Sequence, residues 1–323
     1  MNNLPSNTMK IRRCHSKMLN FLPGPVLYII SSLLLVINTT IWAGLISIGG
    51  LIKLLLPFTA GRNFLTKIMN KFMWSWATCN GGILFLLADI EWDIEGLEKL
   101  DKHGWYLLIS NHLSGLDIAV QTYVLRNHIP MLKFFLKREL LYVPLLGLGC
   151  WALDMPFMSR TSPAKLKKNP KLKGKDLAST RRACEKFKTM PTSIINYVEG
   201  SRFTEEKRIR QDSPYRYLLR PKAGGIAFTL SAMGEQFTNL LNVTLVYPEA
   251  ESDPLSEVMH GKIKKITVKV EVLPVPEVDN KRYFSEAQYR VEFQRWLNQL
   301  WEEKDEQIHQ VMLKNGVAKE DRP

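Results

Sequence analysis

A histidine and an aspartate five positions apart form the first pair in this chain whose spacing indicates chemistry. The segment "LLISNHLSGLDIAV" places His112 and Asp117 directly after an apolar run of strand type. We expect a helix to begin near Ser114 or Gly115, so that His112 lies on the turn at the carboxyl end of a strand, where α/β sheets place their sites. Asp117 would fold back to fix the imidazole tautomer, which makes His112 a candidate general base.

This candidate base has no obvious nucleophile of its own. The chain has no GxSxG elbow, so Ser114 is a poor nucleophile, and no second histidine or cysteine pair completes a metal site. We therefore expect no bound metal and predict that the substrate supplies the hydroxyl. As a spacing alone, HxxxxD also fits a structural histidine.

A second group of residues indicates anion binding. After the strand-type run "SIINYV", the chain continues with Glu199, Gly200, Ser201 and Arg202. Glycine lets a backbone approach a ligand closely, and arginine binds phosphate through two parallel hydrogen bonds. Lys137 and Arg160 add cations at the edges of other predicted strands.

Composition limits the partners. The 323 residues carry a net charge of +13, which favours phospholipid, phosphorylated substrates or nucleic acid. Residues 160–188 hold eleven Lys and Arg against two acidic residues, with Phe187 as the sole aromatic. A nucleic-acid groove needs interleaved aromatic residues, so we expect no nucleic-acid partner. The four cysteines form no CxxC pair, which predicts buried, reduced thiols in a domain facing a reducing compartment.

An apolar stretch near the start of the chain predicts membrane contact. Residues 24–56 contain one charge, Lys53, and as a continuous helix would reach about 50 Å, beyond the roughly 30 Å hydrocarbon core. We expect either one tilted span or a hairpin that breaks near 38–40 or 49–50 and dips into one leaflet. Basic residues on both flanks favour re-entry on the same face. A cleaved signal peptide is the competing interpretation, but the run is too long for one. The apolar patch at 72–90 fits a membrane-surface helix or a core helix equally well.

Strand-type and helix-type segments alternate after residue 90, which predicts an α/β fold. The expected class is a mostly parallel mixed sheet flanked by helices, with an N-terminal hydrophobic membrane-anchoring helical segment. Strands are expected at 89–96, 105–110, 130–137, 153–159, 193–198, 241–247 and 264–273, the last with one wet face. Helices are expected at about 115–127, 138–150, 176–190, 222–234 and 286–312, the last with a capping box from Ser285 to Gln288. We expect an anchoring region at 1–88, a catalytic domain at 89–312 and a tail at 313–323.

Four blocks in order resemble the membrane-bound glycerolipid acyltransferases, and within them the 1-acyl-sn-glycerol-3-phosphate acyltransferases. The first, NHxSxxD, is matched by Asn111, His112, Ser114 and Asp117, and the second by Lys137, Pro144, Gly147 and Arg160. An EGTR-like block reads Glu199 to Arg202 with Ser201 for threonine, and "VTLVYP" ends at Pro248. Together they cover about residues 105–250. Tyr197 and Val198 replace the more usual Phe-Pro.

The resemblance implies a lysophosphatidic acid acyltransferase of the inner (plasma) membrane, with its site on the cytoplasmic side. The fatty acyl group would pass from acyl-CoA or acyl-carrier protein to the sn-2 hydroxyl of lysophosphatidic acid, giving phosphatidic acid for phospholipid synthesis, without a cofactor. His112 and Asp117 would be catalytic, and Glu199, Gly200, Ser201, Arg202, Lys137 and Arg160 would bind substrate, with Glu199 organising Arg202 against the acceptor phosphate. Two alternatives are another lysophospholipid acceptor and a non-catalytic, basic, membrane-anchored protein that binds lipid or nucleic acid.

Overall fold

The computed structural model describes residues 9–11, 19, 21–158, 187 and 190–318. The predicted helix at 176–190, most of the basic segment and Arg160 therefore lie outside the described residues. Within them, seven strands form one sheet in the order β1-β2-β9-β8-β3-β7-β4. Their bounds are Met9–Ile11 (β1), Glu91–Glu95 (β2), Tyr106–Ser110 (β3), Leu132–Phe134 (β4), Ser193–Tyr197 (β7), Asn239–Val246 (β8) and Lys265–Leu273 (β9).

The sheet is mixed and mostly parallel, which confirms the predicted fold class. β8, β3, β7 and β4 run parallel to one another, and β2 runs parallel to β9. The pairings of β1 with β2 and of β8 with β9 are antiparallel. The strand predicted at 130–137 divides into β4 and β5 (Leu136–Lys137), and β5 pairs with β6 (Phe157–Met158) in a separate two-stranded sheet.

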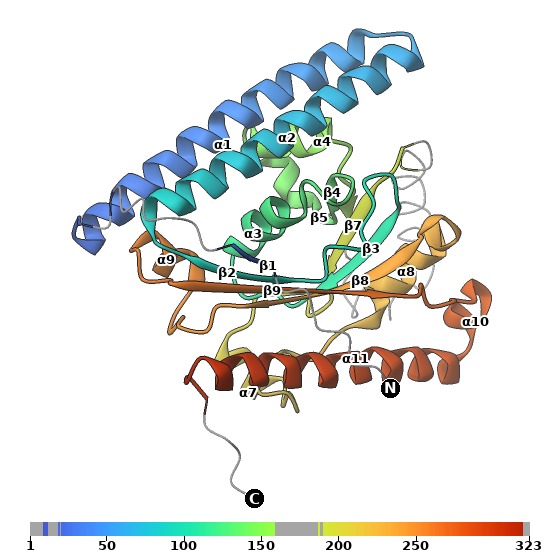
Figure 1. Ribbon diagram of the computed structural model, residues 1–323. Coiled ribbons are helices and arrows are strands. Elements are labelled where there is room, and N and C mark those ends of the chain that lie inside the picture. The colour runs from blue at the N-terminus through green and yellow to red at the C-terminus, as the bar shows by residue number, and fades with distance from the viewer. Residues whose placement is uncertain (1–8, 12–18, 20, 159–186, 188–189, 319–323) are drawn as a thin grey trace, which may run out of the picture.

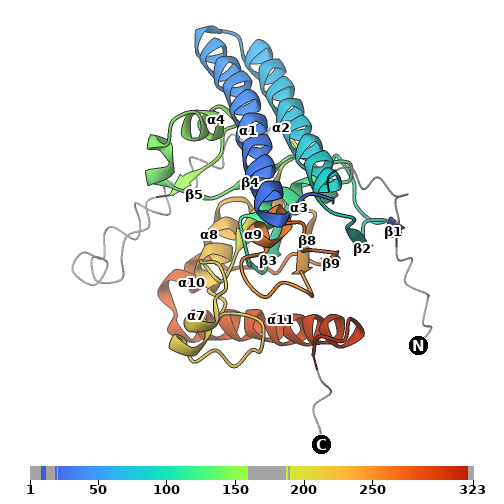
Figure 2. The same ribbon diagram turned by 90° about the vertical axis from the view of Figure 1, so that its left-hand side faces the viewer.

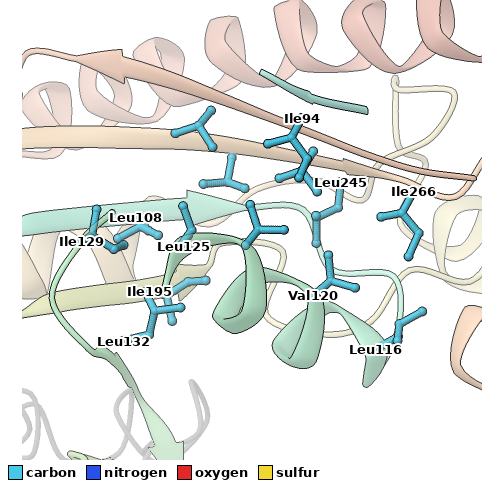
Figure 3. Close-up of a cluster of buried hydrophobic side chains, with 14 of the residues drawn as sticks. Ile94, Leu108, Leu116, Val120, Leu125, Ile129, Leu132, Ile195, Leu245 and Ile266 are labelled. Carbon is cyan, nitrogen blue, oxygen red and sulfur yellow. The ribbon is translucent and has the colours of Figure 1, made fainter. Parts of the chain in front are cut away.

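Helices cover both faces of the sheet (Figure 1). On one face lies α3 (Leu116–Leu125), and on the other lie α8 (Ala223–Met233) and α11 (Ala287–Lys314). Because strand side chains alternate, Leu108 of β3 packs in the core on the α3 side, shown in Figure 3. Its neighbours Leu107 and Ile109 pack in the core on the α8 and α11 side. β3 is thus buried on both faces, as its continuous apolar run predicts.

The described residues also include several short helices. They are η1 (Arg138–Tyr142), α4 (Leu146–Ala152), α7 (Glu205–Arg210), η3 (Gly234–Gln236), α9 (Pro254–Met259) and α10 (Asn280–Ser285). The helix predicted at 138–150 is therefore two pieces, interrupted at Pro144, which has no N–H to donate.

Three finer predictions are wrong. α11 begins after Glu286 without a side-chain cap, because Ser285 ends α10, so the predicted capping box does not form. The polar face of β9 is only partly wet, since Thr267 is fully buried while Glu271 is exposed. Cys79 is an exposed free thiol rather than a buried one.

The N-terminal apolar stretch forms one unbroken helix, α1 (Gly24–Leu55), and α2 (Thr59–Leu87) returns along it (Figure 2). Neither predicted break point is a break. Asn38 donates from Nδ2 to the Asn80 Oδ1 of α2 at 2.7 Å, so this polar residue joins the two helices. A Cβ on Gly50 would lie 2.4 Å from the Cβ of Ala152, so glycine here permits close packing against α4.

One side of α1 is apolar and exposed along its whole length. Among the described residues it is the one helix long and apolar enough to cross a membrane. Its exposed apolar side chains recur at helical spacing, as on a face that contacts lipid. They are Val26, Ile29, Leu33, Val36, Ile37, Ile41, Leu45, Ile48, Leu51, Ile52, Leu54 and Leu55. We call this face the α1 stripe.

The contact between α2 and α3 can be tested at two adjacent glycines. A Cβ on Gly81 would lie 2.1 Å from the Tyr123 ring of α3, whereas a Cβ on Gly82 would meet nothing within 4 Å. Alanine favours a helix over glycine by about 1 kcal/mol, and overpacking costs about 1–3 kcal/mol. We expect Gly82→Ala to raise the melting temperature in detergent and Gly81→Ala to lower it. Equal shifts would mean that α2 does not pack on α3 in this way.

Candidate active site

A buried carboxylate organises the turn after β3. Asp117 is fully buried in the first turn of α3, and its Oδ2 accepts hydrogen bonds from the backbone N–H groups of Leu113 (2.6 Å) and Ser114 (2.9 Å). The same oxygen lies 2.7 Å from His112 Nδ1. Buried backbone amides need acceptors, and Asp117 supplies one to the two amides of the turn that precedes α3. The helix begins after Gly115, as predicted.

The His112 ring is held on two sides. Because Asp117 is an acceptor, His112 carries its hydrogen on Nδ1, which leaves Nε2 as the nitrogen available to a substrate. The ring of Tyr197 stacks on the imidazole, with centroids 4.1 Å apart and planes 17° apart. The imidazole side chain keeps 16% of its surface exposed. The arrangement is that of an oriented general base.

Glu199 ties the turn after β7 to the turn after β3. The two strands are parallel neighbours, so their carboxyl ends meet, with Ser110 opposite Tyr197. Glu199 is fully buried; its Oε1 accepts the His112 N–H at 3.2 Å and its Oε2 accepts the Leu219 N–H at 3.0 Å. These bonds show Glu199 positioning backbone on both sides of the site, where the sequence predicted that it organises Arg202.

A buried lysine lies behind this carboxyl group. Lys304 of α11 donates to the Val243 carbonyl at 2.6 Å and to Thr244 Oγ1 at 3.0 Å. Burial lowers the pKa of Lys304 to about 7 and raises the pKa of Glu199 to about 8, while the opposite charges of the two groups act against both shifts. The long C-terminal helix therefore reaches the core of the site as well as covering the sheet.

β8 contributes two contacts to the same site. Asn111 pairs with the backbone of Leu245 through both side-chain atoms, with Nδ2 donating at 2.8 Å and Oδ1 accepting at 2.9 Å. Tyr247 donates its hydroxyl to Asp117 Oδ1 at 3.0 Å. Burial, followed by the charge of Asp117, raises the pKa of Tyr247 well above its usual value, so the hydroxyl stays a donor. Tyr247 was missed as a site residue, although it stands in the quoted "VTLVYP" block.

A second polar chain supports the stacked tyrosine. Tyr197 donates from its hydroxyl to Gln121 Oε1 at 2.9 Å, and Gln121 Nε2 donates to Ser110 Oγ at 2.6 Å. Gln121 lies one helical turn beyond Asp117 on α3 and is fully buried. No sequence pattern marks these two hydrogen bonds, because they depend on how α3 lies against β3 and β7.

His112 opens onto a cavity of about 530 Å³. One wall is the predicted anion-binding turn, with Gly200, Ser201 and Arg202, and Gly200 has a φ of +74°, which favours glycine. The other wall is apolar and consists of Phe134, Phe135, Leu136, Leu140 and Ile195. A second cavity, of about 640 Å³, shares Arg202 and Lys207 with the first.

Two further residues of the predicted motifs, Ser114 and Lys137, can also be located. Ser114 donates to Asp253 Oδ1 at 2.6 Å and accepts the Leu255 N–H at 3.1 Å, so its hydroxyl holds α9. Lys137 lies in β5 beside the cavity residue Leu136, but its side chain is outside the described part of the chain. In that described part, no group of three or more His, Cys, Asp or Glu residues is placed to hold a metal ion.

Comparison with known proteins identifies the family. The sequence model described as "Acyltransferase" matches residues 91–260, which is more than half of the chain. The chain belongs to the acyltransferase family. This membership confirms the resemblance in the sequence, and the matched acyltransferase region contains all of the site residues described above except Lys304.

Curated relatives and a solved structure agree with the family. A 1-acyl-sn-glycerol-3-phosphate acyltransferase delta of Homo sapiens is 27% identical over 184 residues, 54% of this chain and 43% of the relative. A 1-acyl-sn-glycerol-3-phosphate acyltransferase 3 of Arabidopsis thaliana is 23% identical over 240 residues, 69% of this chain and 57% of the relative. The chain thus matches about half the length of these relatives. The crystal structure of the 1-acyl-sn-glycerophosphate acyltransferase of Thermotoga maritima shares the fold, with a TM-score of 0.54 at 16% identity, covering 92% of this chain and 98% of that one.

Two substitutions at Tyr197 test the roles of its ring and its hydroxyl separately. Aromatic stacking is worth about 0.5–1.5 kcal/mol, so Tyr197→Ala is expected to lower kcat for acyl transfer by up to about tenfold through a looser His112 ring. Tyr197→Phe keeps the ring and is expected to lower the melting temperature more than kcat, because Gln121 loses its buried donor. Equal kcat losses in the two variants would contradict a positioning role for the ring.

Proposed function

We propose that this chain transfers a fatty acyl group from a thioester, acyl-CoA or acyl-carrier protein, to the sn-2 hydroxyl of lysophosphatidic acid, giving phosphatidic acid. The observation that carries the proposal is the His112–Asp117 pair, bonded at 2.7 Å, on a cavity that Arg202 also lines. The two relatives named above are 1-acyl-sn-glycerol-3-phosphate acyltransferases, which supports lysophosphatidic acid as the acceptor. The donor serves as co-substrate, and no cofactor takes part.

In the proposed reaction, His112 Nε2 takes the proton of the acceptor hydroxyl as its oxygen bonds to the thioester carbon. The carbon–sulfur bond then breaks and the proton passes from His112 to the leaving sulfur. A thiol of this type has a pKa near 8.5, so it leaves readily and direct attack by the alcohol suffices. Asp117 keeps the ring in the correct tautomer and stabilises the imidazolium.

The basic turn after β7 is the proposed phosphate site. Arg202 and Lys207 border both cavities, and Lys207 donates to the Arg202 carbonyl at 2.7 Å, which places two cations side by side. We propose that Arg202 binds the acceptor phosphate, with Gly200 and Ser201 lining the approach. Lys137 and Arg160 remain proposed contributors.

The proposed location is the inner (plasma) membrane, with the site facing the cytoplasm. The α1 stripe supports attachment to a bilayer, and the free thiols of Cys79 and Cys150 suit a reducing compartment. We propose that residues 1–88 anchor the chain, that 89–312 carry catalysis and that 313–323 form a tail.

Loss of the imidazole tests the proposed chemistry. General-base help is worth about 10²–10⁴-fold, so His112→Ala is expected to lower kcat by that factor with labelled acyl-CoA and lysophosphatidic acid. The control is His103→Ala, at an exposed histidine outside the cavity. Acyl transfer by His112→Ala at the wild-type rate would end the proposal. A panel of lysolipids in the same assay separates lysophosphatidic acid from other acceptors.

Loss of the cation tests the phosphate site. Arg202→Ala is expected to raise the acceptor KM at least tenfold, since a hydrogen bond to a charged group is worth about 1.5–3 kcal/mol, and to leave the donor KM nearly unchanged. Arg210→Ala, at an exposed residue of α7 outside both cavities, is the matched control. A rise in the donor KM alone would assign Arg202 to the donor instead.

A further inference from the structure

An apolar surface separate from α1 lies where η1 meets α4. Leu141, Val143, Leu145 and Leu146 are 38% to 44% exposed, and Tyr142 is 75% exposed. The sequence from Leu140 to Trp151 contains no charged residue. Scattered exposed apolar residues are ordinary, but a consecutive run of them marks a contact surface. We call residues 141–146 the η1–α4 lip.

The lip is continuous with the α1 stripe. Ser47 of α1 donates to the Leu145 carbonyl at 3.5 Å, and a Cβ on Gly149 would lie 3.8 Å from the Cβ of Ala43. Figure 2 shows α4 beside α1, away from α7 and α11. The one charge of α1, Lys53, is paired at 2.5 Å with Asp154, just beyond α4. Lip and stripe therefore form one apolar surface.

The lip has a defined backbone shape. Gly147 donates to the Val143 carbonyl at 2.8 Å, and a Cβ on Gly147 would lie 2.3 Å from the Leu141 carbonyl oxygen. Leu145 has a φ of +58°, in the left-handed region that disfavours non-glycine residues. This tight turn keeps apolar side chains outside without burying them, at a cost in backbone strain.

The inner side of the same segment borders the cavity. Leu136 of β5 and Leu140 of η1 line the cavity that contains His112. Leu140 is followed directly in the sequence by the exposed residues of the lip, so the lip adjoins the apolar part of the cavity lining. A lipid with one acyl chain could pass from the lip to this lining without exposing that chain to water.

We propose that the η1–α4 lip inserts into the bilayer beside α1, and that the lipid acceptor passes over it from the membrane to His112. The proposal rests on the proposed function. Lipid is the occupant because the lip continues the α1 stripe and is uncharged throughout.

A fluorescent probe tests the insertion. Tyr142→Cys, made in a chain whose four native cysteines are replaced, is labelled with NBD and reconstituted into phosphatidylcholine–phosphatidylglycerol vesicles that contain brominated lipid. We expect blue-shifted, quenched emission, as for Ile41→Cys on the α1 stripe. The matched control is Ile209→Cys on α7, at a side chain 66% exposed on the opposite side of the domain, which should stay unquenched. An unquenched probe at 142 together with a quenched probe at 41 would overturn the proposal.

Activity provides the second readout and separates the proposal from the proposed function. Two acylation rates are compared, that of a long-chain acceptor in vesicles and that of a water-soluble short-chain acceptor. Tyr142→Asp is expected to lower the ratio of the first rate to the second several-fold. Ile209→Asp is expected to leave this ratio unchanged. An unchanged ratio in Tyr142→Asp would contradict the proposed passage of the acceptor over the η1–α4 lip. Absence of acyl transfer from the unmodified chain on both acceptors would instead refute the proposed function, whatever the probe reports.

Discussion

The buried Asp117 carboxylate is the interaction on which the site depends. A buried anion is tolerated only when hydrogen bonds replace its lost hydration, and Asp117 receives them from two backbone amides, the His112 ring and the Tyr247 hydroxyl. These partners come from the β3 turn and from the residue after β8. One carboxylate therefore fixes the shape of a turn, the orientation of an imidazole and the distance between two strand ends.

Parallel neighbours explain why these groups meet. β8, β3 and β7 lie side by side and run in the same direction, so the residues that follow them collect at one edge of the sheet. The His112 turn and the Glu199 turn are joined by hydrogen bonds in both directions, from His112 N–H to Glu199 and from Phe203 N–H to the His112 carbonyl. A shift of either strand would thus move His112 relative to the turn that contains Arg202.

Site residues that follow a strand directly could be predicted from the sequence. Site residues whose partners lie on other strands could not. His112, Asp117 and the Glu199–Arg202 turn each follow an apolar run, so strand ends marked them. Tyr247 and Gln121 lack such a mark, because their partners are set by which strands are neighbours and by how α3 lies on them. The predicted breaks in α1 failed for a related reason: polar and small residues in an apolar helix also serve helix–helix contact, as Asn38 and Gly50 do.

The lining of the cavity at His112 has a basic part and an apolar part. Arg202 and Lys207 stand on the wall after β7, while Leu136 and Leu140 stand on the wall that leads to α1. In the proposed reaction, a lysolipid lies with its phosphate toward these cations and its acyl chain toward these apolar residues, and its glycerol hydroxyl reaches His112. On the opposite face of the sheet, α11 closes the site with buried Lys304. We propose that this asymmetry orients an amphipathic acceptor, and that the α1 stripe holds the protein against a membrane in the matching direction.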